Sequence, residues 1–152
     1  MAKGNGGTRA SVSGRVTGTG IFTPDDLSSF FTSVDKVFLK KYNKEDDDTA
    51  RALGGDRLGT VFAPKGSVEN VSVSSIHPCQ PGINAKQVIS LAQDIKKNGM
   101  NETPSAIKVG KEVYLLNGHH RVAAEIVNGV KKVRVRLVEV SREEWEQQRN
   151  KQ

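Results

Sequence analysis

Hydrophobic residues in the second half of the chain recur at two different periods, which predicts strands and helices in alternation. Val133, Val135 and Leu137 occupy every second position, as in a strand that turns one face to the core. Elsewhere apolar residues recur three and four positions apart, as in helices with one buried face. The patterns predict a first strand that starts near Val68 and ends at Ile76-His77-Pro78, further strands at 104–109, 113–116 and 133–137, and helices at 84–98, 119–127 and from 141 onward. This alternation predicts an α/β fold of the α+β kind, with a small mixed sheet and flanking helices.

A further helix is predicted upstream, beginning at Thr23, which is followed by a proline and two aspartates. A capping residue, a proline in the first turn and early acids are typical of a helix start. Apolar residues then recur at helical spacing to about Lys41, among them Phe30, Phe31, Val34 and Phe38. This apolar face either packs on its own domain, which we favour, or docks a protein partner through the N-terminal helix.

Linker signatures divide the chain into three predicted parts. Residues 1–20 are rich in Gly, Ser and Thr and predict a flexible basic arm. Residues 21–64 predict an N-terminal helical extension and linker, and residues 65–152 the α/β domain. We expect the compact core to lie between about Val61 and Val140.

Two segments of the extension carry few apolar residues. The acid run Glu45–Asp48 predicts a solvated loop, and the Gly-rich segment Leu53–Gly59 predicts a flexible connection. That segment lacks the lysine and spacing of a phosphate-cradling P-loop. A short strand is expected near Thr60–Ala63.

The amino-acid composition makes the chain basic. The chain has 152 residues and a formal net charge of +6. Residues 65–152 contain fourteen Lys/Arg and nine Asp/Glu, so most of the excess lies in the α/β domain. A basic surface attracts polyanions, and we expect nucleic acid as the partner, DNA before RNA. The size and charge would suit a phage or mobile-element protein.

The cysteine count and the apolar runs indicate the compartment. A single cysteine excludes an intramolecular disulfide and favours a reducing cytosol. No apolar run approaches the ~20 residues needed to cross a bilayer, and the first residues lack the apolar core of a signal peptide. We therefore expect a soluble cytoplasmic protein without membrane partners.

Candidate chemistry concentrates where the strand Val113–Leu116 turns into a helix at Asn117-Gly118. Gly118 is followed by His119, His120 and Arg121, so two of the three histidines of the chain lie at this turn. A helix N-terminus carries unsatisfied N–H groups and a partial positive charge, which attract anions. Glycine lets a ligand approach the backbone, and arginine can form two hydrogen bonds to a phosphate. The turn predicts a phosphate site.

The residues around this turn resemble the ParB/sulfiredoxin superfamily from Val71 to Trp145. A segment like Ile76–Pro78 leads in that family to a helix like Lys86–Leu91. A strand like Pro104–Val109 follows, and then the strand–turn–helix element that carries Gly118–Arg121. The resemblance implies a ParB/sulfiredoxin-like mixed sheet and phosphate recognition by the second histidine, the arginine and the backbone after the glycine of the turn.

Two departures from the family limit the activity that the resemblance implies. In sulfiredoxins the turn reads Gly-Cys-His-Arg and its cysteine is the attacking group, whereas His119 occupies that position here and Cys79 lies far upstream. Thiol-based repair of sulfinic acids is therefore not expected. Chromosome-partitioning ParB proteins have a turn richer in arginine and then a DNA-reading helical domain, for which this chain leaves no room.

Further candidate residues surround the turn. Lys86, close to a lysine of sulfiredoxin-like proteins that approaches nucleotide phosphates, is a second phosphate ligand or an exposed helix-start lysine. His77 either converges on the site or remains a surface residue, which we favour, and Glu125 is expected to pair with Arg121. The expected nucleic-acid contacts are Lys131, Lys132, Arg134 and Arg136. No residue pattern predicts a zinc site.

Three functions are compatible with these residues. The first, which we favour, is a ParB-like nuclease in which His119 or His120 is the general base or acid and Arg121 stabilises the phosphorane-like charge. Mg²⁺ or Mn²⁺ would be its metal. The second is a switch or phosphotransferase that binds ATP or CTP through Asn117, Gly118 and the same side chains. The third is a non-catalytic adaptor for nucleic acid or protein.

Overall fold

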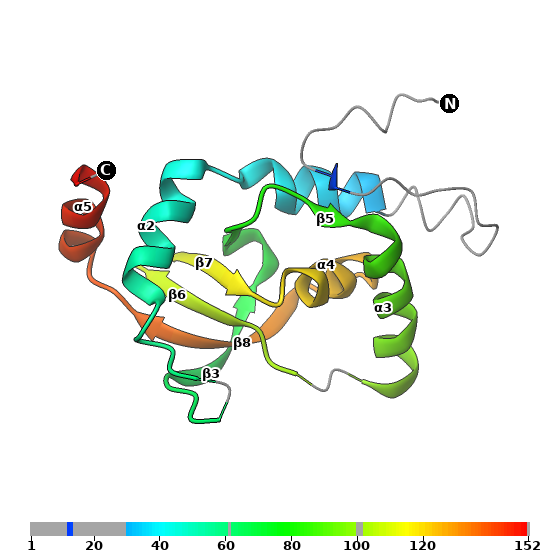
Figure 1. Cartoon of the computed structure of the whole chain (residues 1–152). Helices are drawn as coiled ribbons and strands as arrows, with labels where there is room; N and C mark the ends of the chain where they lie inside the picture. Colours follow the sequence, from blue (N-terminus) through cyan, green and yellow to red (C-terminus); the bar gives the residue numbers. More distant parts are fainter. Residues whose placement is uncertain (1–11, 14–29, 61, 100–101, 152) are drawn as a thin grey trace.

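The computed structural model describes residues 12–13, 30–60, 62–99 and 102–151 (Figure 1). Strands and helices alternate from β3 onward, so the predicted α/β class with a mixed sheet and flanking helices is confirmed. The elements follow in the order β2 (Val12–Ser13), η1 (Phe30–Phe38), η2 (Leu39–Lys41), α2 (Lys44–Gly54), β3 (Ser67–Ser72), η3 (Val73–Ser75), β4 (Ile76–Pro78), β5 (Ile83–Asn84), α3 (Ala85–Asn98), β6 (Ser105–Val109), β7 (Glu112–Asn117), α4 (His119–Val127), β8 (Lys132–Glu139) and α5 (Arg142–Asn150).

Five strands form the central sheet in the order β3-β8-β6-β7-β4. β8 pairs antiparallel with β3 and parallel with β6, whereas β7 pairs antiparallel with β6 and parallel with β4. In this register Asn117, the last residue of β7, lies opposite Ser105, the first residue of β6. The turn from β7 into α4 therefore begins beside the start of β6.

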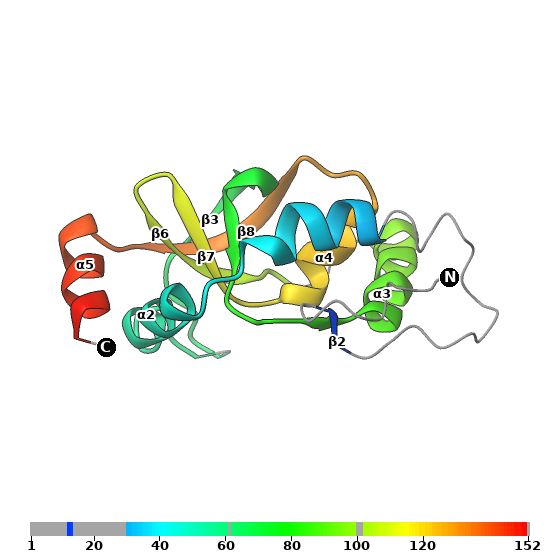
Figure 2. The ribbon, with the colours of Figure 1, turned by 90° about the horizontal axis from the view of Figure 1, so that it is seen from above.

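Helices cover both faces of the sheet. The first core cluster lies under α3, α4 and η1 and includes Phe38, Val88, Leu115 and Val122. The second lies under α2 and α5, where the Trp145 ring stacks on Tyr114 with centroids 4.3 Å apart. Figures 1 and 2 show α2 and α5 at one end of the molecule and α3 at the other. Each helix has one buried face because its apolar residues recur at helical spacing.

The predicted helix starts in the α/β domain are confirmed by their caps. Asn84 accepts a hydrogen bond from the N–H of Gln87 at 2.9 Å, and Ser141 accepts one from the N–H of Glu144 at 3.1 Å. Such caps satisfy N–H groups that have no partner within the helix. Gly99, at φ 82°, ends α3 where the sequence predicted its end. No helix in the described ranges is long and apolar enough to cross a membrane.

The loop predicted at Glu45–Asp48 is wrong, because this acid run forms the first turn of α2. Asn43 caps the helix, since its Oδ1 accepts a hydrogen bond from the N–H of Asp46 at 2.9 Å. Negative side chains in the first turn stabilise the helix through its dipole. Asp46 and Glu45 also pair with Arg149 of α5. The charges thus stabilise a helix end and its packing partner.

The predictions for residues 53–63 also need correction. Leu53 and Gly54 belong to α2, and a Cβ built at Gly54 would lie 2.2 Å from Leu116 Cδ1, so this glycine lets the helix pack closely on the sheet. At the strand predicted at Thr60–Ala63, the described residues Thr60, Phe62 and Ala63 are not in a strand, and they lie between the two partners of an isolated bridge, Gly59 and Pro64. One bridge cannot extend into a ladder because the loop turns back at once.

The N-terminal segment contributes to the core, which extends beyond the predicted limits of Val61 and Val140. Val34 and Phe38 are fully buried in the first core cluster, as is Trp145 in the second. Removing these apolar side chains from water stabilises the fold. Val12 and Ser13 pair parallel with Ile83 and Asn84. The rest of the predicted arm, and the predicted helix start at Thr23, lie outside the described residues.

Candidate functional site

The turn between β7 and α4 is built around a glycine in the left-handed region. Gly118 has φ 80°, and a Cβ placed on it would lie 2.7 Å from Cβ of Pro104. Both the backbone angle and the close approach therefore require glycine. Asn117 Oδ1 accepts the N–H of Ser105 at 2.9 Å, which fixes the turn to the start of β6. The N-terminus of α4 is thus held rigidly at the end of β7.

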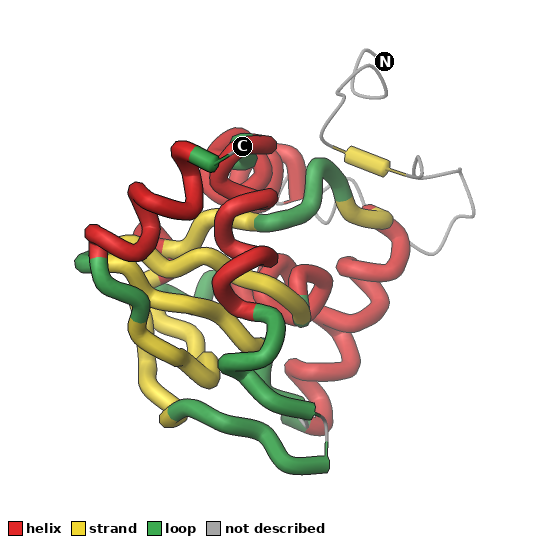
Figure 3. Tube along the Cα trace, turned by 60° about the vertical axis from the view of Figure 1, so that its left-hand side comes forward, coloured by secondary structure: helices red, strands yellow, loops and turns green. Residues whose placement is uncertain are grey.

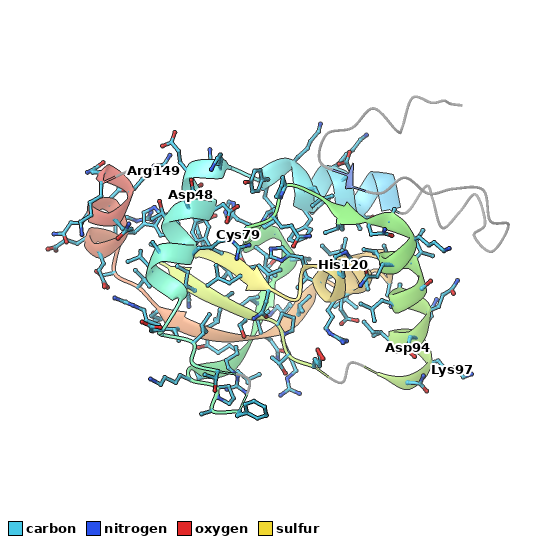
Figure 4. The ribbon with its side chains drawn as sticks, viewed as in Figure 1. Asp48, Cys79, Asp94, Lys97, His120 and Arg149 are labelled. Atoms are coloured by element: carbon cyan, nitrogen blue, oxygen red, sulfur yellow. The ribbon has the colours of Figure 1, made fainter. Side chains whose placement is uncertain are left out.

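A cavity of about 740 Å³ opens at this N-terminus. The turn contributes the predicted residues Asn117, Gly118, His119, His120 and Arg121, which the fold brings together on its wall. The remaining polar walls come from α2, α3 and the loop between β4 and β5: Arg51, Gln80, Gln87, Ser90 and Asp94. Figure 4 shows His120 at the start of α4 and Asp94 on α3, far from Arg149 at the other end.

His119 is buried and holds the loop that follows β4. Its Nε2 accepts the N–H of Cys79 at 2.9 Å, and its ring also hydrogen-bonds the backbone of Leu115. Burial, with a smaller contribution from the charge of Arg51, lowers the pKa of His119 to about 4. The ring is therefore neutral near pH 7, with its proton assigned to Nδ1 from these contacts.

His120 makes an equivalent contact with β5, the strand that follows this loop. Its Nε2 accepts the N–H of Asn84 at 3.2 Å, and burial lowers the pKa of this half-buried imidazole. A neutral ring that accepts at Nε2 carries its proton at Nδ1, so Nδ1–H is its donor. The sequence predicted a general base or acid at His119 or His120, and in both residues Nε2 accepts a backbone hydrogen bond.

Two arginines and one carboxylate, Asp94, line the cavity. Arg121 forms an ion pair with Glu102 at 3.2 Å, although the Glu102 side chain is 66% exposed. Exposed pairs contribute little, about 0–1 kcal/mol, so a phosphate could displace Glu102. Arg51 pairs with Asp47 at 2.7 Å and also donates to the carbonyl of Cys79.

Other predicted residues lie away from this cavity. Lys86 is exposed on α3 and does not line it, whereas the next residue, Gln87, does. His77 pairs with Glu112 and stacks on Tyr114, with ring centroids 4.9 Å apart. Burial raises the pKa of Glu125. Lys131, Lys132 and Arg134 are exposed, Arg136 is half-buried, and none of the four lines the first cavity.

The sequence interpretation missed the wall residues of α2 and α3. Gln87, Ser90 and Asp94 are three and four positions apart, so they share one face of α3. That polar stripe beside an apolar one was visible in the sequence, but its nearness to the turn was not. Arg51 was missed because its helix was predicted to begin as a loop.

Cys79 does not supply thiol chemistry to the cavity. Its side chain is buried, and burial raises its pKa to about 12. Among the described residues, no group of three or more His, Cys, Asp or Glu side chains could hold a metal ion.

The structure is similar to the crystal structure of sulfiredoxin from Arabidopsis thaliana, with a TM-score of 0.45 and 17% identity over 54% of this chain and 96% of that chain. No protein-family model matches the chain, and no curated protein matches it.

Proposed function

We propose that the protein binds a phosphate group of a nucleic acid or nucleotide in the cavity at the Gly118 turn. The observation that carries the proposal is the convergence of Arg51, Arg121 and the N-terminus of α4 on one cavity. The first N–H groups of a helix have no partner within it, and with the helix dipole they favour an anion. Arginine adds a positive charge and can form two parallel hydrogen bonds to phosphate oxygens.

Neutral side chains complete a set of donors suited to phosphate. His120 would donate through Nδ1–H, and Gln80, Gln87 and Ser90 offer amide and hydroxyl donors on the same walls. His119 would act through the loop: by accepting the N–H of Cys79 it holds Gln80 at the cavity. Protonation is not needed for any of these contacts, so binding should persist at neutral pH.

The test is a binding comparison between Arg121→Ala and a charge-matched control. Arg121→Ala should weaken binding about 10- to 150-fold, because a charge-assisted contact contributes roughly 1.5–3 kcal/mol. Arg121→Lys should restore part of this, since it keeps the charge and loses the fork. Lys111→Ala removes an exposed charge at the opposite end of the β6–β7 hairpin and should change binding less than about twofold.

Binding is measured by fluorescence anisotropy with labelled DNA and RNA, and by calorimetry with ATP and CTP. Circular dichroism verifies that each variant is folded. If Arg121→Ala binds every one of these ligands as well as the wild type, the phosphate site is wrong. Binding of ATP or CTP alone would identify the switch or phosphotransferase rather than a nucleic-acid protein.

Hydrolysis of a phosphodiester is a second candidate, because Asp94 and His120 border the same cavity as Arg121. Asp94 would accept a proton from the attacking water and pass it to the leaving oxygen, the neutral His120 would donate a hydrogen bond to that oxygen from Nδ1–H, and Arg121 would stabilise the charge on phosphorus. These roles differ from the general base or acid predicted from the sequence at His119 or His120. No step is assigned to Mg²⁺ or Mn²⁺, because the described residues offer no cluster of three ligands.

The hydrolysis candidate is tested by incubating the protein with plasmid, single-stranded DNA and RNA, with and without Mg²⁺ or Mn²⁺. Asp94→Asn should abolish cleavage and leave binding within about twofold, since the amide keeps the shape and loses the base. Cleavage that survives in Asp94→Asn would refute the role of this carboxylate. Binding without cleavage under all conditions would refute hydrolysis and favour the non-catalytic adaptor.

A further inference from the structure

A second cavity of about 550 Å³ adjoins the first and shares Asn117, Gly118 and Arg121 with it. The turn therefore forms a wall that the two cavities share. Beyond the shared residues, the second cavity presents hydroxyl groups and another guanidinium. The side chains concerned are Thr60, Thr103, Ser105 and Arg136.

Arg136 extends the positive charge away from the turn. Ser105 is the register neighbour of Asn117 on one side and of Arg136 on the other, so the three residues cross the adjacent strands β7, β6 and β8. Two strand spacings correspond to roughly 10 Å, which is too far for one phosphate group to bridge. Arg136 Nη1 donates to the carbonyl of Gly66 at 3.3 Å, which holds the guanidinium beside the loop that precedes β3. Glu102 is the carboxylate on this wall.

The loop between α2 and β3 borders the second cavity and exposes a phenylalanine. Thr60 and Pro64 both line the cavity, and between them Phe62 is 97% exposed. The loop is closed by hydrogen bonds from the N–H of Ala63 to Thr60 and from Lys65 to Leu58 at 2.8 Å. Figure 1 shows this loop at the lower edge of the molecule beside β3, and Figure 3 shows it as a loop that leads into a strand.

A glycine fixes the shape of this loop. Gly59 has φ 76°, and a Cβ there would lie 2.5 Å from the carbonyl oxygen of Ala63. Because the loop is closed so tightly, the Phe62 ring stays outside the core. It is exposed to water and therefore lacks the stabilisation that an aromatic ring gains from burial. A large exposed ring next to a cationic, hydroxyl-lined hollow is the combination that binds the bases and phosphates of a single strand.

We propose that the second cavity is a subsite for a single-stranded nucleotide chain, in which Arg121 holds one phosphate, Arg136 holds the neighbouring phosphate and Phe62 stacks on a base. The proposal rests on the proposed phosphate site and names its ligand as a chain with at least two phosphates. Lys132 and Arg134 continue the path, since they alternate with buried valines and share the face of Arg136 on β8.

The experiment compares a labelled single-stranded oligothymidine of about 12 nucleotides with inorganic phosphate, using the full chain. Phe62→Ala should weaken oligonucleotide binding about 5- to 100-fold, as expected for one lost base stack, and Phe62→Trp should restore it. Arg136→Ala should weaken it about 10-fold or more and lower the slope of log K against log salt by about 0.7. Phe62→Ala should leave the binding of inorganic phosphate, measured by calorimetry, within about twofold of the wild type, because the ring is proposed to contact a base and not a phosphate.

Arg121→Ala and Lys111→Ala are the comparison variants. If Phe62→Ala and Arg136→Ala bind the oligonucleotide like the wild type while Arg121→Ala does not, the second subsite is wrong and the phosphate site stands. If all three bind like the wild type, the proposed function is wrong as well. Equal competition by an acidic peptide, with no effect of Phe62→Ala, would overturn the nucleotide chain as ligand.

Discussion

The buried histidine His119 should make the protein less stable in mild acid. Its Nε2 must be unprotonated to accept the N–H of Cys79, and burial lowers its pKa to about 4 from 6.5. The unfolded chain therefore binds more protons than the folded one between these values. His119 contributes stability that is fully present above about pH 6.5 and is lost as the pH falls towards 4.

The magnitude follows from the size of this pKa difference. A fall from 6.5 to about 4 corresponds to about 3 kcal/mol in total, at 1.36 kcal/mol per pKa unit. Linkage gives a loss of about 2 kcal/mol between roughly pH 7.5 and pH 5. Urea unfolding at both pH values measures this loss in the wild type and in His119→Gln, whose side-chain oxygen can still accept the Cys79 N–H without titrating.

The difference between the two proteins isolates His119, because carboxylates titrate in both. We expect the wild type to lose about 2 kcal/mol more than His119→Gln over this range. Equal losses would refute the role of His119. Nuclear magnetic resonance provides a direct check if the variant does not fold, since the wild-type imidazole should titrate near pH 4. Titration near 6.5 would contradict the buried, neutral ring.

Two further predictions concern the turn and the cysteine. Gly118→Ala should be more destabilising than Gly129→Ala in urea unfolding: both have positive φ, at a cost of about 1–3 kcal/mol, but only the Cβ at 118 would meet Pro104, at 2.7 Å. Equal costs would contradict this close approach. Cys79 should react with iodoacetamide about 1000-fold more slowly in the folded than in the unfolded protein, because burial raises its pKa to about 12 from 9.0. Rapid alkylation of the folded protein would refute the buried thiol.

Local patterns were sufficient to predict most of the α/β domain. The alternation of Val133, Val135 and Leu137 identified β8, and Asn84 and Ser141 identified the starts of α3 and α5, because a strand face and a helix cap depend on residues close in sequence. The loop predicted at Glu45–Asp48 was wrong because the helix there depends on contacts that are distant in sequence. Its charges are satisfied by the helix dipole and by Arg149, more than a hundred residues away.

The candidate site was predicted in its position and not in its contacts. The sequence places His119, His120 and Arg121 after a glycine, which is enough to predict a helix N-terminus with a positive charge. It does not contain the distance from each Nε2 to the N–H groups of Cys79 and Asn84, which decides whether the imidazoles can act as bases. Arg51 and Asp94 reach the cavity only through the packing of α2 and α3.

The measurement that tests the phosphate site most directly is a titration of ¹⁵N-labelled protein with a short oligonucleotide, followed by amide chemical shifts. The account predicts that the largest shifts occur at residues 118–122 and at Gln87, which surround the first cavity, and that they are lost in Arg121→Ala. Saturable shifts confined to other surfaces, such as α5, would contradict a phosphate site at the Gly118 turn.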